Sequence, residues 1–172
     1  LEMGFTDRLF VAPVSRYAIV LGRLAGTAAL GAISAIYYVV VGLIFGVTYE
    51  EGVGGVALMV LWVTLAAVAF GSIAAAIALR TGRASVVQGM FPMIFVILFL
   101  STAFFPAELM QEPAATVAQY NPLSFVVAGV RDPVVSVVTG AGVLKAFASI
   151  AGFAALGLGL SALAMRRRLR LG

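Results

Sequence analysis

No charged residue interrupts the chain from Ala25 to Val47, and nearly every residue in this stretch is apolar. A helix that crosses a bilayer needs about 20 such residues, because each adds about 1.5 Å and the hydrocarbon core is about 30 Å thick. The stretch is therefore long enough to span a membrane. The whole sequence is 63% hydrophobic and only 10% charged, which leaves too little polar surface for a soluble domain of this size.

Three more apolar stretches follow, each bounded by polar or proline-containing turns. The predicted membrane spans cover about residues 20–47, 56–79, 86–105 and 146–165. Trp62, near the start of the second span, is expected in the aromatic belt at the membrane surface. Pro92 lies inside the third span, where neighbouring groups can satisfy the carbonyl that a proline leaves unpaired. Serines within spans, such as Ser72 and Ser101, are expected to bond to helix carbonyls.

The segment 106–142 differs from the spans because it is semi-polar and contains four prolines. Its apolar stretches, 114–118 and 125–130, are too short to cross a bilayer. They suit short external re-entrant or interfacial helices. The sequence therefore predicts an all-α, polytopic transmembrane helical bundle of about four spanning helices, forming one membrane domain over residues 1–172.

The basic residues predict the orientation of this bundle, because cytoplasmic loops are enriched in lysine and arginine. With the N-terminal segment and the C-terminus in the cytoplasm, all but two basic residues lie inside. These inner residues are Arg8, Arg16, Arg23, Arg80, Arg83, Arg166, Arg167, Arg168 and Arg170. Arg131 and Lys145 lie outside, as do the acidic residues of the two external segments. The expected location is the cell membrane.

Several chemistries are excluded by composition. The chain has no histidine and no cysteine, so no catalytic residue and no metal site are predicted. Its single lysine, Lys145, follows Leu144, so no phosphate-binding loop of the G-x-x-x-x-G-K-[ST] type exists. No cofactor is expected on this chain, and any ATP must be hydrolysed by a partner. The basic residues flank apolar runs, so no nucleic-acid partner is predicted and membrane lipid is the expected contact.

Small residues recur at helical spacing along the spans, which allows close approach of neighbouring helices. The pairs are Gly22 with Gly26, Gly42 with Gly46 and Gly71 with Ala75, and the last span has Ala151, Ala155 and Gly159. These faces suit packing within the chain or contact with a second chain, and the pattern does not distinguish the two.

Before the first span, residues 1–16 combine apolar and charged side chains, and Pro13 should end any helix there. A short amphipathic surface helix followed by a turn fits this pattern.

Two groups of residues resemble a known family. Glu2, Gly4, Arg8, Pro13, Val14, Ser15 and Arg16, followed by Leu21-Gly22-Arg23, resemble the cytoplasmic segment of ABC-2 type permeases, the membrane subunits of ATP-binding-cassette exporters. Phe104-Phe105-Pro106, Asn121-Pro122-Leu123-Ser124 and Arg131 resemble the external segment of that family. The motifs occur in the family's order over essentially the whole chain. Family members have six spans, so the resemblance implies that this chain holds the third to sixth and that an N-terminal part is absent.

The resemblance implies a permease of the drug-resistance type that moves a hydrophobic or amphipathic compound (a drug, lipid or glycolipid) outward. An ABC ATPase subunit and a second permease chain, identical or different, would be its partners. The implied ATPase-coupling residues are Glu2, Gly4, Arg8, Pro13, Ser15 and Arg16. The implied external cap over the exit path contains Phe105, Pro106, Asn121, Pro122 and Arg131.

Two other functions remain as alternatives. A secondary carrier or channel would need ionisable residues or a polar lining inside the spans, and the predicted spans show neither away from their edges. A non-transporting structural membrane protein would have no ATPase partner, so an ATPase encoded beside this chain would distinguish it from a permease.

Overall fold

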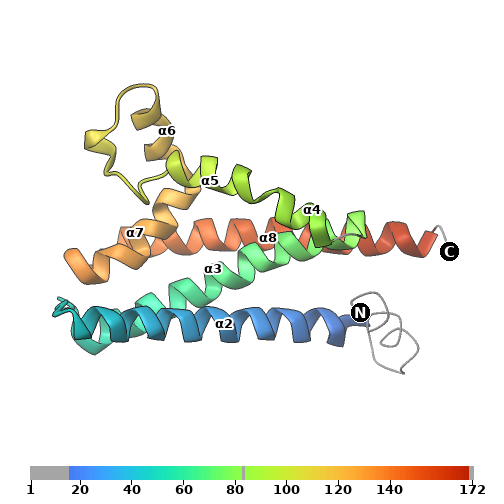
Figure 1. Cartoon of the computed structure of the whole chain (residues 1–172), viewed down its shortest axis with the longest axis horizontal. Coiled ribbons are helices and arrows are strands. Elements are labelled where there is room, and N and C mark those ends of the chain that lie inside the picture. The colour runs from blue at the N-terminus through green and yellow to red at the C-terminus, as the bar shows by residue number, and fades with distance from the viewer. Residues whose placement is uncertain (1–15, 83, 171–172) are drawn as a thin grey trace.

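The computed structural model describes residues 16–82 and 84–170, and within these ranges it is helical with no strand (Figure 1). The helices are α2 (Arg16–Ile44), α3 (Gly52–Thr81), α4 (Ala84–Gly89), α5 (Phe91–Phe99), the 3-10 helix η1 (Ala107–Leu109), α6 (Ala114–Tyr120), α7 (Pro122–Val135) and α8 (Gly140–Arg170). The all-α, polytopic bundle predicted from the sequence is confirmed.

Three helices in the described part of the chain are long and apolar enough to cross a membrane. These stretches are Leu21–Ile44 in α2, Gly52–Thr81 in α3 and Gly140–Leu163 in α8. They correspond to three of the four predicted spans, with ends that differ by a few residues. Most of their residues are not buried against other helices, as expected when the surrounding solvent is lipid.

The remaining apolar stretch is not one helix but two. α4 ends at Gly89 and α5 begins at Phe91, with Pro92 in the first turn of α5. A proline is readily accommodated there, because the first amides of a helix have no partner within it. The sequence predicts a span at 86–105, but the regular helix ends at Phe99 and turns follow. Figure 1 shows α5 leading away from the long helices.

α3 is the central helix, with α2 and α8 packed against it and α7 packed against both α3 and α8. Trp62 is only 3% exposed and lies in the core with Val126, Ala146 and Ile150. The expectation that Trp62 belongs to a surface belt is therefore wrong. Gly129 of α7 explains how the ring fits: a Cβ there would lie 2.7 Å from the Cβ of Ala146 and 3.5 Å from the indole.

The close contact between α3 and α8 is made by Gly157, against which Ser72 packs. The hydroxyl of Ser161 donates a hydrogen bond to the carbonyl of Ser72 (3.3 Å) and joins the two helices one turn further along. The small residues singled out in α8 are on another face: Ala151, Ala155 and Gly159 are all exposed. Their spacing predicted a close helix contact, but packing within the chain uses Gly157 instead.

The turns at the end of the bundle opposite Arg16 are tied to one another. Tyr49 Oη donates to the carbonyl of Val39 (3.1 Å), which holds the turn between α2 and α3 against α2. Glu51 Oε1 accepts a hydrogen bond from the amide of Val138 (3.1 Å), in the turn between α7 and α8. The connections of all three long helices are thereby fixed at this end.

Candidate functional site

A cavity of about 520 Å³ lies between α2, α3, α4 and α8. The cavity is at the end of the bundle where α2 begins and α3 ends. We call this the basic end, because the helix segments found there contain Arg16, Arg23, Arg80 and the arginines of 166–170. Figure 1 shows α2 and α3 close together near their connecting turn and separated toward the basic end.

The shape of the cavity follows from the side chains on α2 and α3. Cγ2 of Thr27 would be 2.8 Å from a Cβ at Gly71, so the two helices are in close contact at this pair. Toward the end of α3 the cavity wall is formed by Ala74, Ala75 and Ala78. These short side chains leave space next to α2 that larger residues would fill.

The hydroxyl groups that line the cavity donate their protons to helix carbonyls. Thr27 Oγ1 donates to the carbonyl of Arg23 (2.9 Å) and Ser72 Oγ to that of Ala69 (2.7 Å). Ser161 Oγ donates to Ser72, as described above. Their oxygens remain as acceptors, and the amide of Gln88 from α4 adds a further polar group to the lining.

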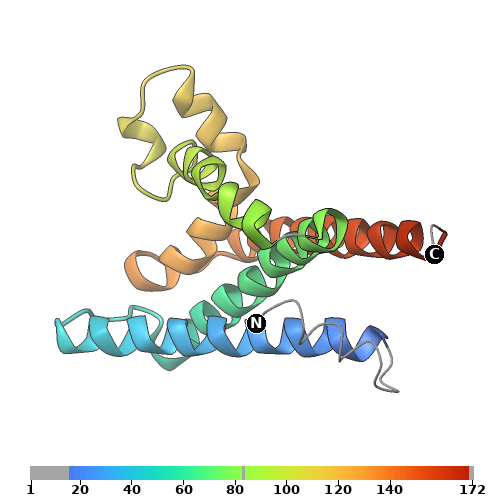
Figure 2. The same cartoon turned by 45° about the vertical axis from the view of Figure 1, so that its right-hand side comes forward.

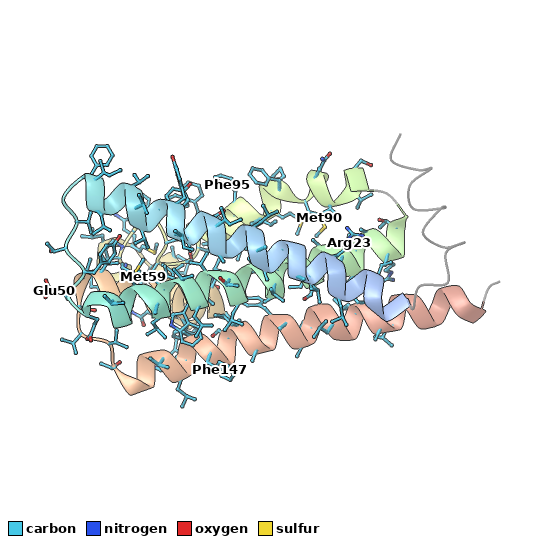
Figure 3. All side chains as sticks on the ribbon, turned by 90° about the horizontal axis from the view of Figure 1, so that it is seen from below. Arg23, Glu50, Met59, Met90, Phe95 and Phe147 are labelled. Carbon is cyan, nitrogen blue, oxygen red and sulfur yellow. The ribbon has the colours of Figure 1, made fainter. Side chains whose placement is uncertain are left out.

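Arg23 is the charged residue among the described residues that line the cavity. It is exposed, and it makes no hydrogen bond or ion pair through its side chain with residues 16–82 or 84–170. The acidic residues of the described ranges (Glu50, Glu51, Glu108, Glu112 and Asp132) belong to the other end of the molecule. Figure 3 shows Arg23 near α4 and Glu50 at the opposite end.

A second arrangement of polar groups joins α5 to α7. Asn121 Oδ1 accepts a hydrogen bond from the amide of Leu123 (2.9 Å) and so caps the start of α7, while Pro122 occupies the first turn of that helix. Asn121 Nδ2 donates to the carbonyls of Ile97 (3.2 Å) and Leu100 (3.0 Å). One side chain therefore provides hydrogen-bond partners for a backbone amide at the start of α7 and for backbone carbonyls at the end of α5.

Two buried serines support this connection, which we call the α5–α7 junction (residues 97–102 and 121–124). Ser124 Oγ accepts from the amide of Thr102 (3.1 Å), and Ser101 Oγ donates to the carbonyl of Leu98 (2.6 Å). The expectation that Ser72 and Ser101 bond to helix carbonyls is confirmed. Figure 2 shows the junction on the part of the chain that projects from the long helices.

The structure brings only some of the sequence-predicted site residues together. Asn121 and Pro122 lie in the α5–α7 junction. Phe105 and Pro106 lie in the turns after α5, and Arg131 is exposed on α7, about two and a half helical turns after Pro122. Among the coupling residues, Arg16 is the first residue of α2. Glu2, Gly4, Arg8, Pro13 and Ser15 are outside the described residues.

The cavity and the role of Ser124 were not predicted from the sequence. The sequence held two signals for the cavity. The arginine within the first turns of a span was interpreted only as a cytoplasmic charge, and the small residues Gly71 and Ala75 were interpreted as a packing face. Within the described ranges, no group of three or more Asp, Glu, His or Cys residues could hold a metal ion.

Comparison with known proteins gives one match. A family model described as "ABC-2 family transporter protein" matches residues 2–163, which include all the described helices except the end of α8. No curated protein and no solved structure matches the chain. ABC-2 membrane proteins are transport subunits that associate with an ABC ATPase. The chain belongs to the ABC-2 transporter family, as a multi-pass membrane permease of an ABC transporter.

Proposed function

We propose that the chain is the permease subunit of an exporter, moving a hydrophobic or amphipathic compound outward with ATP hydrolysed by a separate subunit. The observation that carries this proposal is the cavity at the basic end of the bundle, between three helices long enough to span the membrane. A cavity that opens near one membrane face suits the loading state of a transporter, in which a site is accessible from one side.

The basic end faces the cytoplasm in this proposal. Arginines cluster there, and the acidic residues of the described ranges lie at the other end. The compound would therefore be loaded from the cytoplasm or the inner leaflet and released past the α5–α7 junction. A second permease chain would complete the pathway, because the cavity lies at one end of the bundle formed by this chain.

Coupling to the ATPase would act through the start of α2. Residues 1–15 lead directly into this helix, whose residues Arg23 to Leu30 contribute to the cavity wall. A partner that pushed on the preceding segment would tilt α2 against α3 and change the cavity. Rigid-body rocking of packed helices between two states is a common means of coupling.

Coupling is tested by charge reversal in the N-terminal segment of the complete transporter. Glu2→Lys and Arg8→Glu should each reduce co-purification of the ATPase and lower substrate-stimulated ATP turnover by about tenfold or more, because loss of a paired interface charge costs about 2–5 kcal/mol. Glu50→Lys, at the other end of the bundle, is the matched control and should retain both. ATPase pairing and transport that survive both N-terminal reversals would contradict the coupling role.

Orientation can be tested directly because the chain has no cysteine to remove. Thr48 lies in the turn after α2 and Ser85 near the start of α4, and both are exposed. A membrane-impermeant maleimide added to intact cells should label Thr48→Cys and should label Ser85→Cys only after the cells are opened. The reverse pattern would place the basic end outside and refute loading from the cytoplasm.

A further inference from the structure

We propose that the cavity binds an amphiphile with an anionic head group, the head paired with Arg23 and the tail against the alanine-lined wall of α3. This inference rests on the proposed transport function and names the substrate class that the cavity selects. Among the described residues of the lining, the one guanidinium is that of Arg23, which is exposed and lies beside an apolar recess.

The size of the cavity is the first support. Its volume of about 520 Å³ falls within the range of about 300–1,000 Å³ that is usual for small-molecule sites. Ala74, Ala75 and Ala78 on α3 and Leu30 on α2 provide apolar surface on both sides. An apolar tail inserted here would be removed from water, which contributes about 0.8 kcal/mol for each buried CH₂ group.

Arg23 supplies the second support. A guanidinium presents five donors in a planar fork that fits phosphate, sulfate or carboxylate oxygens two at a time. No residue of 16–82 or 84–170 uses these donors. An arginine within the first turns of a membrane helix is costly unless it reaches water or pairs with an anion, and a bound head group would provide that anion.

The distribution of the described acidic residues favours an anionic head group. The described acidic side chains are all at the far end of the bundle, so none offsets Arg23. A cationic amphiphile would meet an unpaired like charge in this recess and would be rejected, while a neutral one would gain only the apolar contacts. Gln88 of α4, also in the lining, can donate a hydrogen bond to an anionic or a neutral polar head group, or accept one from a neutral head group.

The experiment measures equilibrium binding of radiolabelled dodecyl phosphate to the complete ATPase–permease complex in phosphatidylcholine nanodiscs, without nucleotide. Unlabelled dodecyl phosphate should compete at least about tenfold better than dodecyl maltoside and better still than dodecyltrimethylammonium. Inorganic phosphate should not compete, because it lacks the tail. Equal competition by all three amphiphiles, or competition by inorganic phosphate alone, would overturn the proposal.

Three variants test whether the head group binds at Arg23. Arg23→Gln should weaken dodecyl phosphate binding about tenfold and leave dodecyl maltoside binding unchanged, whereas Arg23→Lys should retain the preference for the anion. Arg80→Gln, an arginine at the same end that does not line the cavity, should bind as wild type. Loss of the preference in Arg80→Gln, or its retention in Arg23→Gln, would overturn the assignment of the head group to Arg23.

The tail is tested by filling the recess. Neither Gly22 nor Gly26 has a neighbour within 4 Å of the position of a Cβ, so both should accept a larger residue, but only Gly26 lines the cavity. Gly26→Leu should therefore weaken binding of every amphiphile about tenfold, and Gly22→Leu should have no effect. Equal effects of the two variants would show that the amphiphile binds elsewhere.

Nanodiscs that contain phosphatidylglycerol distinguish the two sources of an anionic head. Competition by this lipid would assign the site to a bilayer phospholipid. Undiminished binding of dodecyl phosphate would assign the site to a single-tailed compound. Both outcomes support an anionic head group paired with Arg23. Failure of the binding tests in a complex that still couples ATP turnover to transport would overturn this inference alone. Absence of ATPase co-purification would instead contradict the proposed function.

Discussion

Gly157→Ala should lower the free energy of unfolding by about 2 kcal/mol, and the Tm of the detergent-solubilised protein by roughly 4–8 °C. The new Cβ would overlap Ser72 Oγ and would lie 2.7 Å from the amide nitrogen and 2.9 Å from the carbonyl carbon of the adjoining peptide on α3. A hydroxyl can rotate away, but the backbone of a packed helix cannot. The helices α3 and α8 must therefore separate.

Gly159→Ala is the matched control, two residues away on the same helix, with no atom within 4 Å of its Cβ position. Alanine is favoured over glycine in a helix by about 1 kcal/mol, so this variant should be neutral or stabilising. The two substitutions are chemically identical and should act in opposite directions. A Tm for Gly157→Ala equal to that of Gly159→Ala would contradict the close contact between α3 and α8. Adding Ser72→Ala to Gly157→Ala should restore only part of the loss, since the backbone clash remains.

Asn121→Ala should destabilise the α5–α7 junction by about 2 kcal/mol. It removes a helix cap, worth about 1 kcal/mol, and two hydrogen bonds to carbonyls at the end of α5, each worth about 0.5–1.5 kcal/mol and partly replaced by water. Released from Asn121, the end of α5 should open locally. Hydrogen exchange of peptides covering residues 97–103 should therefore become faster while exchange in α8 stays unchanged.

Asn121→Asp separates the two roles of this side chain. A carboxylate retains the acceptor for the amide of Leu123, but it places negative charge beside the carbonyls of Ile97 and Leu100. The start of α7 should remain protected while residues 97–103 exchange faster. Gln119→Ala, an exposed amide side chain two residues earlier in α6, is the control and should leave both regions as in the wild type. Wild-type exchange in Asn121→Asp would show that the donors of Asn121 do not hold α5.

The α5–α7 junction gives a structural role to two residues of the external cap that the family resemblance implies. Asn121 and Pro122 start α7 and fasten it to α5, whereas Arg131 contributes no hydrogen bond or ion pair among the described residues. α7 is in turn packed between α3 and α8 through Gly129 and the buried Pro133. Movement of the long helices would therefore be transmitted through α7 to α5, at the end of the molecule from which we propose release.

The sequence by itself determined the properties that depend on composition over a short range. Residues 20–47, 56–79 and 146–165 were predicted as spans because their length and lack of charge allow a helix to satisfy its own backbone in lipid, whatever its neighbours are. The all-α class followed from the same reasoning. The placement of basic residues at one end of the bundle also follows from the order of charges along the chain.

Only the tertiary structure decided how the helices meet. Pro92 is compatible with a kinked span or with the start of a new helix. In the structure it lies in the first turn of a new helix, α5. Spacing alone could not tell that Gly157 rather than Gly159 contacts α3, or that Gly129 makes room for Trp62 in the core. The cavity beside Arg23 depends on the angle between α2 and α3 and on which alanines face it. These features arise from contacts between residues far apart in the chain. A local sequence pattern does not specify which helix will pack against each face.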